Sequence, residues 1–217
     1  MGSSLSKIRS SARIGIAICL LLPLGATVQD PSVENADASE AEYEVFSPYM
    51  SRSFVGVIGE HRVGNRVSQI VIVNRTESDK EDLVDEDMVP PGGVEKYLRK
   101  EVPSLRIATI RNFHRANVKQ AQLALRFRLP LQYQLISVEK IGSILKDVSS
   151  WREYYSQYPG AQGYIALSRV GFSPDGKQAV FYASNRCGGK CATGSYVVME
   201  KHGSRWKLVK GVFIWMS

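Results

Sequence analysis

Two cysteines near the C-terminal end have the spacing in this chain that is best suited to chemistry. Cys187 and Cys191 enclose the tripeptide Gly-Gly-Lys, and Cys19 is the third cysteine. Such a pair can form a disulfide, act as a redox centre or supply half of a metal site. Redox pairs usually open a helix as Cys-x-x-Cys, and a metal site needs further Cys or His ligands. We therefore predict a structural disulfide between Cys187 and Cys191, in a loop whose glycines allow a tight ring.

The three histidines, by contrast, are not arranged for chemistry. His61, His114 and His202 show no paired spacing for a metal, and the sequence has no nucleophile elbow, phosphate loop or dinucleotide fingerprint. The acidic segment Glu77–Asp87 lacks the glycine and terminal glutamate that an EF-hand needs, so it favours a solvated loop over a calcium site. We expect no cofactor and no metal, and catalytic residues stay unassigned.

A basic stripe is predicted on a helix spanning Leu105–Lys119. Arg111, Arg115 and Lys119 recur at steps of four, which places them on one helix face. The ordinary interpretation is a solvated face. The alternative hypothesis is a docking site for an anionic component of the cell envelope or for a lipid headgroup.

The N-terminus has the pattern of a secretory signal peptide. Lys7, Arg9 and Arg13 precede an apolar run over Ile14–Leu22, and small residues follow it up to Ala26. The apolar run is too short for a spanning helix. We therefore expect residues 1–26 to be removed on export to the periplasm or the extracellular space.

The rest of the chain is predicted to form a spacer and one domain. Residues 27–41 are small and acidic, which is typical of a disordered segment. Residues 42–217 are enough for a single domain with its own core. Removing the three basic signal residues reduces the net charge from +7 to +4. That modest charge argues against nucleic acid as a partner, and no second apolar run is long enough for a transmembrane segment.

Apolar periodicity and turn signals predict an α+β fold, an antiparallel β-meander with helices packed on one face. The expected helices are Glu42–Val55, Val94–Glu101, Leu105–Lys119 (with Ser104 as N-cap), Val138–Val148 and Ser150–Tyr158. The expected strands are Val67–Val73, Gln122–Phe127, Gln132–Ser137, Tyr164–Phe172, Gln178–Ser184, Tyr196–Lys201 and Trp206–Met216, with Asp175-Gly176 and His202-Gly203 as hairpin turns.

An aromatic stripe marks the last predicted helix. Trp151, Tyr155 and Tyr158 recur at helical spacing, which predicts that they pack into the core. Trp206 and Trp215 are expected on the sheet face behind them. The alternative is a solvent-facing platform on which sugars stack.

The C-terminal region resembles a family of uncharacterised exported bacterial proteins. The resemblance covers most of residues 42–217 and rests on Tyr158-Pro-Gly160, Gly163, Ser168-Arg-Val-Gly-Phe172, Gln178-Ala179, Cys187-Gly-x-x-Cys191, Gly194, Trp206 and Trp215-x-Ser217. It implies one intact domain from a bacterium, and it carries no activity and no site residue.

Two functional hypotheses follow from the sequence. The first is a non-enzymatic binding or interaction module of the cell envelope. The alternative is a hydrolase with a dispersed active site, because catalytic residues assemble in space and not along the chain. A deep pocket that holds His114 or His202 beside a carboxylate would favour the enzyme.

Overall fold

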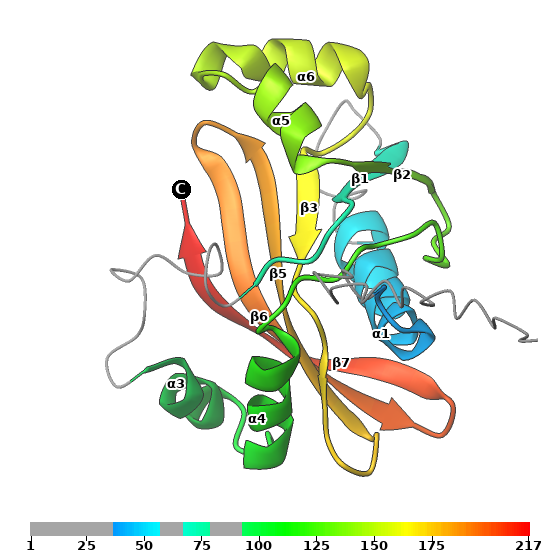
Figure 1. Ribbon diagram of the computed structural model, residues 1–217, viewed down its shortest axis with the longest axis vertical. Coiled ribbons are helices and arrows are strands. Elements are labelled where there is room, and N and C mark those ends of the chain that lie inside the picture. Colours follow the sequence, from blue (N-terminus) through cyan, green and yellow to red (C-terminus); the bar gives the residue numbers. More distant parts are fainter. Residues whose placement is uncertain (1–36, 57–66, 79–92) are drawn as a thin grey trace, which may run out of the picture. The chain divides into compact units, whose positions relative to one another are not determined.

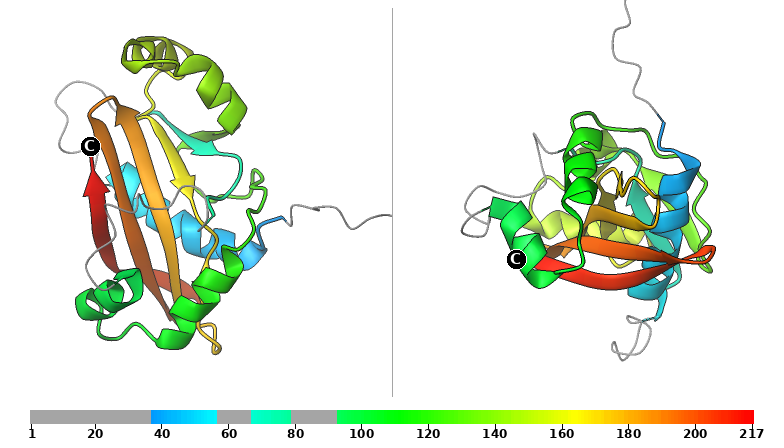
Figure 2. Two further views of the ribbon diagram at one scale, coloured as in Figure 1. Left: turned by 60° about the vertical axis from the view of Figure 1, so that its left-hand side comes forward. Right: turned by 90° about the horizontal axis from the view of Figure 1, so that it is seen from below.

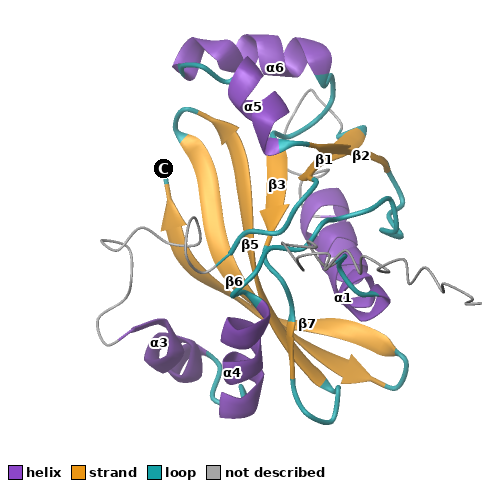
Figure 3. Cartoon of the chain, in the orientation of Figure 1, coloured by secondary structure: helices purple, strands orange, loops and turns teal. Residues whose placement is uncertain are grey.

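The computed structural model describes residues 37–56, 67–78 and 93–217, all within the unit Asn35–Ser217 (Figures 1 and 3). Its helices are α1 (Glu40–Met50), α3 (Gly93–Glu101), α4 (Ile107–Ala116), α5 (Val138–Ile144) and α6 (Trp151–Gln157), with a π-helical turn η1 (Ser51–Gly56) and a 3-10 turn η3 (Val148–Ser150). Its strands are β1 (Gln69–Val73), β2 (Gln132–Ile136), β3 (Tyr164–Leu167), β4 (Gly171–Phe172), β5 (Gln178–Gly188), β6 (Cys191–His202) and β7 (Arg205–Met216). None of the helices in these ranges combines the length and apolar character that crossing a membrane requires.

The strands form one mixed sheet in the order β2-β1-β3-β5-β6-β7, and β4 pairs with β5. The α+β class is confirmed, and β3 to β7 pair antiparallel as in the predicted meander. The other end differs, because β1 pairs parallel with both β2 and β3. Parallel neighbours need long crossover connections, and the chain supplies them through α3 and α4 and then through α5 and α6.

Apolar side chains pack on both faces of the sheet. On β5, Phe181 packs against α1, whereas Val180 and Tyr182 pack against α3 and α4. A third cluster, which includes Val71 and Tyr154, holds α5 and α6 against the parallel strands. Figure 2 shows α1 on the other side of the sheet from α3 and α4. The prediction that the helices pack on one face is therefore wrong. The cause lies in β5, which is apolar at consecutive positions, as strands covered on both faces are.

Several predicted boundaries differ in the structure. The strand predicted over Tyr164–Phe172 is divided into β3 and β4. The segment predicted as a strand over Gln122–Phe127 forms only isolated bridges at Gln122. The N-cap of α4 is Arg106 and not Ser104. The buried Gln178 explains this start, because its side-chain oxygen accepts the Arg106 N–H at 2.9 Å. The predicted helix over Val138–Val148 ends at Ile144, and the turn η3 follows it.

Folded structure begins inside the predicted spacer. Ala38 is buried and donates its N–H to the Gln122 carbonyl at 3.0 Å, and α1 begins at Glu40. Residues 37–41 are therefore part of the domain, because a hydrogen bond to Gln122, which is distant in the sequence, holds this segment in place. The predicted signal peptide, the spacer up to residue 36 and most of the acidic segment lie outside the described residues.

The aromatic stripe on α6 packs mainly inward. Tyr154 is fully buried, Tyr158 is 9% exposed, and Trp151 and Tyr155 are half-buried against the same cluster. This supports the core interpretation over a solvent-facing platform.

The predicted position of the two C-terminal tryptophans is wrong for Trp206. Trp206 packs on the α1 face, with its ring 5.9 Å from that of Phe172. Trp215 instead donates its indole N–H to the Tyr182 hydroxyl at 2.7 Å, on the opposite face. Trp206 and Trp215 are nine residues apart on β7, and their partners on β6, Lys201 and Gly194, are seven residues apart. Both separations are odd, because the two register shifts between the strands add two residues to β7 in total. Alternation along a strand therefore places them on opposite faces.

The predicted disulfide is present. Cys187 and Cys191 are bonded across the end of the β5–β6 hairpin, with their Cα atoms 5.0 Å apart.

The disulfide should make a small contribution to stability. We expect the double variant Cys187→Ala/Cys191→Ala to have a free energy of unfolding about 2 kcal/mol lower than that of the wild type, because closing so small a loop removes little entropy from the unfolded state. Urea denaturation checks the value, and non-reducing mass spectrometry checks the bond. Two free thiols in protein prepared without a reductant would contradict a structural role.

Candidate functional site

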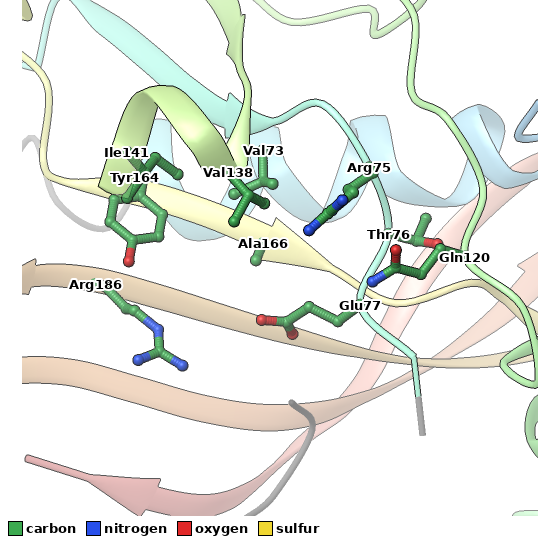
Figure 4. Close-up of a pocket in the computed structure, with 10 residues that line it drawn as sticks. All are labelled: Val73, Arg75, Thr76, Glu77, Gln120, Val138, Ile141, Tyr164, Ala166 and Arg186. Atoms are coloured by element: carbon green, nitrogen blue, oxygen red, sulfur yellow. The ribbon is translucent and has the colours of Figure 1, made fainter. Parts of the chain in front are cut away.

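A pocket lies where the segment after β1 meets β3, β5 and α5 (Figure 4). It encloses about 220 Å³. Its lining residues are Val73, Arg75, Thr76, Glu77, Gln120, Val138, Ile141, Tyr164, Ala166 and Arg186. The pocket thus combines apolar side chains with two guanidinium groups, one carboxylate, an amide and a phenol.

Backbone hydrogen bonds fix the segment that follows β1. The Thr76 N–H donates to the Ala121 carbonyl at 2.8 Å, and the Glu77 N–H donates to the Leu167 carbonyl at 2.9 Å. Side chains alternate along such an extended segment, so Arg75 and Glu77 share one side. The hydroxyl of the fully buried Thr76 accepts the Ala121 N–H at 2.8 Å. Because Thr76 is buried on one side of the segment, Arg75 and Glu77 both extend on the other side, where they line the pocket.

Tyr164 of β3 and Arg186 of β5 supply another wall of the pocket. The two residues are register partners in an antiparallel pair, so their side chains lie on the same face. The Arg186 guanidinium carbon lies 5.6 Å from the Trp215 ring centre, a distance typical of a cation–π contact. Gly163 has a φ of +75°, and a Cβ there would collide with the Arg186 carbonyl. This glycine therefore permits the close backbone approach that brings Arg186 to the pocket.

Glu77 and Arg186 influence the same tyrosine hydroxyls. Burial raises the pKa of Tyr164 above its ordinary value, Arg186 opposes the rise, and Glu77 adds to it. Burial also raises the pKa of Tyr182, again with Glu77 adding and Arg186 opposing. The Ser184 hydroxyl donates to Glu77 Oε1 at 3.4 Å. Glu77 and Arg186 therefore belong to one charged cluster, and both tyrosines stay neutral at neutral pH.

Arg75 has an exposed contact and a buried donor. Its Nη1 lies 3.7 Å from Glu139 Oε1, and the two side chains are 39% and 75% exposed, so this ion pair contributes little. The Nε of Arg75 is buried and has no hydrogen-bond acceptor among the described residues. Buried donors without acceptors are uncommon in proteins. Figure 4 shows the guanidinium extending toward the space that Glu77 and Gln120 also enter.

The basic residues predicted as a docking stripe do not line this pocket. Arg111 and Arg115 are exposed one turn apart on α4. Lys119 lies beyond the helix, which Asn117 ends by donating its side-chain amide to the Phe113 carbonyl at 2.9 Å. Side-chain bonds of this kind compete with helix continuation, so the predicted stripe of three on one helix face is wrong at its last member.

The docking hypothesis for these three residues stays a prediction. We expect the purified protein to bind anionic vesicles at low salt, and the variant carrying Arg111→Glu, Arg115→Glu and Lys119→Glu to lose that binding. The reason is that attraction between exposed charges is strongest at low ionic strength. Vesicle co-sedimentation measures it, with Lys146→Glu as a control on a different helix end. Equal binding by both proteins would reduce these residues to a solvated surface.

The histidines also lie elsewhere. His114 is exposed on α4, with its ring 5.4 Å from that of Phe113, and His202 is exposed at the end of β6, next to the β6–β7 turn. His61 lies outside the described residues. The pocket lining therefore offers Glu77 as its carboxylate but neither His114 nor His202 beside it.

Sequence reasoning missed the residues that the pocket brings together. Arg75, Glu77, Gln120, Tyr164 and Arg186 come from four distant segments. One usable signal was the charged pair Arg75 and Glu77, directly after a buried strand. The other was Arg186, which lies near the end of a long apolar strand, just before Cys187. Neither signal says which strands become neighbours.

Comparison of the chain with protein-family models, curated proteins and solved structures finds no match.

Proposed function

We propose that the protein is an exported, non-enzymatic binding module of the bacterial cell envelope, and that the charged pocket is its ligand site. The observation that carries this proposal is the convergence of Arg75, Glu77 and Arg186 beside apolar side chains. A few placed polar groups with apolar walls are typical of small-ligand sites. Their origin in distant segments means that the fold as a whole builds the site.

The chemistry of the lining supports binding over hydrolysis. A hydrolase needs a nucleophile activated by a nearby base. In the described part of the chain, the lining hydroxyls belong to Thr76 and Tyr164. The Thr76 hydroxyl accepts a backbone N–H, and burial raises the pKa of Tyr164 and keeps it neutral. These groups are suited to hydrogen bonding with a ligand.

Two features support export. The N-terminal pattern of basic residues, an apolar run and small residues is that of a signal peptide. The Cys187–Cys191 bond fits an oxidising compartment, where disulfides persist. Expression of the full chain in a bacterial host and N-terminal sequencing of the exported protein test this. We expect a start between Gly25 and Asp30, and an intact Met1 in soluble protein would overturn export.

Thermal denaturation tests the ligand site. A panel of small anions and zwitterions should include compounds that raise the melting temperature by about 5–10 °C at a hundredfold excess over Kd. Arg186→Gln should remove that shift, and Arg152→Gln, an exposed change on α6, should keep it. A shift that survives Arg186→Gln would place the binding elsewhere.

A further inference from the structure

The charges in the pocket alternate in sign. In the view of Figure 4 the Glu77 carboxylate is seen between the guanidinium groups of Arg75 and Arg186, and all three residues line the pocket. The two arginines and the glutamate give these three side chains a net charge of +1. A ligand with two negative groups and one positive group between them matches this order.

The Arg75 end presents a donor that needs an acceptor. Its Nε is buried without an acceptor among the described residues. Arg75 and Glu77 are two residues apart on an extended segment, which corresponds to a rise of about 6.5–7 Å. A ligand with a carboxylate and an ammonium on the same carbon can therefore contact both side chains at once. A carboxylate has about four acceptor positions, so Glu77, which accepts the Ser184 hydroxyl at 3.4 Å, can accept an ammonium donor as well.

The other end of the pocket suits a second carboxylate. Arg186 is held against Trp215, and the neutral Tyr164 hydroxyl lies on the same face as a further donor. Val138 and Ile141 line the pocket from α5 and suit a short methylene chain. The volume of about 220 Å³ is below the usual range for drug-sized ligands, so the ligand is small.

Resting on the proposed ligand site, we propose that the pocket binds an acidic α-amino acid. Arg75 takes its α-carboxylate, Glu77 takes its ammonium, and Arg186 with Tyr164 takes its side-chain carboxylate. Glu77 gives the selectivity, because it attracts the ammonium and repels ligands that carry only negative charge. Neutral amino acids lack the group for Arg186, and basic ones place a positive charge beside it.

Isothermal titration calorimetry of the exported protein tests this ligand class. The probes are L- and D-glutamate and L- and D-aspartate, with L-alanine, L-lysine, glutarate and inorganic phosphate for comparison. Glutarate has both carboxylates of glutamate and lacks the ammonium. We expect at least one acidic amino acid to bind more tightly than all four comparison compounds.

The variants make the test specific to Glu77. Glu77→Gln should weaken binding of the acidic amino acid by about tenfold or more, because a charge-assisted hydrogen bond is lost, and should not weaken glutarate binding. Arg186→Gln should weaken both. Glu95→Gln, an exposed change on α3, is the matched control, and circular dichroism confirms that each variant is folded.

The outcomes separate the inference from the proposed function. If glutarate or phosphate binds as tightly as glutamate and depends on Arg186, the pocket is an anion site and the amino-acid inference is overturned. The same holds if Glu77→Gln leaves glutamate binding unchanged. If no probe binds the wild-type protein, the inference is overturned, and the proposed ligand site then depends on the thermal panel alone.

Discussion

Phe181→Ala should lower the free energy of unfolding by about 3–5 kcal/mol, the usual cost of removing a fully buried aromatic ring. Phe181 lies on the central strand β5 with no exposed surface. Its ring centre is 5.2 Å from the ring centres of both Phe46 and Tyr49, in edge-to-face arrangements. These contacts join α1 to the sheet. Removing the ring would therefore leave a cavity at the interface between α1 and β5.

Urea denaturation measures the loss. The matched control is Phe213→Ala on the edge strand β7, where the side chain is 48% exposed. The control should lose less free energy of unfolding than the buried site, because only about half of the Phe213 surface leaves water on folding. Equal losses at the two positions would contradict the packing of α1 on β5.

Glu42→Ala should cost a similar amount, about 3–5 kcal/mol, because it leaves a largely buried arginine without its partner. Glu42 is 2% exposed, and its carboxylate lies 3.0 Å from the Arg169 guanidinium. It also accepts the backbone N–H groups of Ser39 at 2.8 Å and Val170 at 3.1 Å. One carboxylate thus holds the start of α1 to the loop between β3 and β4.

The same carboxylate makes stability depend on pH. Burial alone raises the pKa of Glu42, but the bonds from Arg169, Ser39 and Val170 outweigh it, so the folded-state pKa lies below 4.5. A lowered pKa in the folded state adds stability above the unfolded pKa, and this is lost as pH falls through the folded value. Stability should therefore fall below about pH 4.5, and less steeply in Glu42→Gln.

Glu44→Ala is the control for both experiments. Glu44 is two residues further along α1, and its carboxylate pairs with Lys201 at 3.4 Å in a half-exposed position. Such pairs contribute about 0–1 kcal/mol. If Glu42→Ala unfolds with the same free energy as Glu44→Ala, or if the two show the same acid profile, the structural role of Glu42 is wrong.

The C-terminal hairpins could be predicted because local signals specify them. Asp175-Gly176 and His202-Gly203 separate apolar strands, and the structure places both glycines at positive φ, 65° and 63°. Glycine adopts such angles without strain, so the turn sequence and the turn geometry agree. The disulfide was predictable for the same reason, since both cysteines lie on one short loop.

The candidate site could not be predicted, because it depends on strand neighbours. Arg75 and Arg186 line the same pocket only because β1 lies parallel beside β3, which pairs with β5. The apolar pattern of β1 says that the strand is buried and does not name its partner. The predicted end of α4 was wrong for a related reason. The Asn117 side chain, which ends the helix, exchanges hydrogen bonds with the backbone of Arg169, a residue distant in the sequence.

The most direct test of the central claim is to map where a ligand binds by the amide chemical shifts of the ¹⁵N-labelled protein. Titration with glutamate, and with any compound that shifts the melting temperature, should perturb amides around Arg75, Glu77, Gln120, Tyr164 and Arg186. The amides of α3 and of the β6–β7 turn should stay unchanged. Saturable binding that perturbs α4 or the β6–β7 turn and leaves the pocket amides unchanged would contradict the assignment of the pocket as the ligand site.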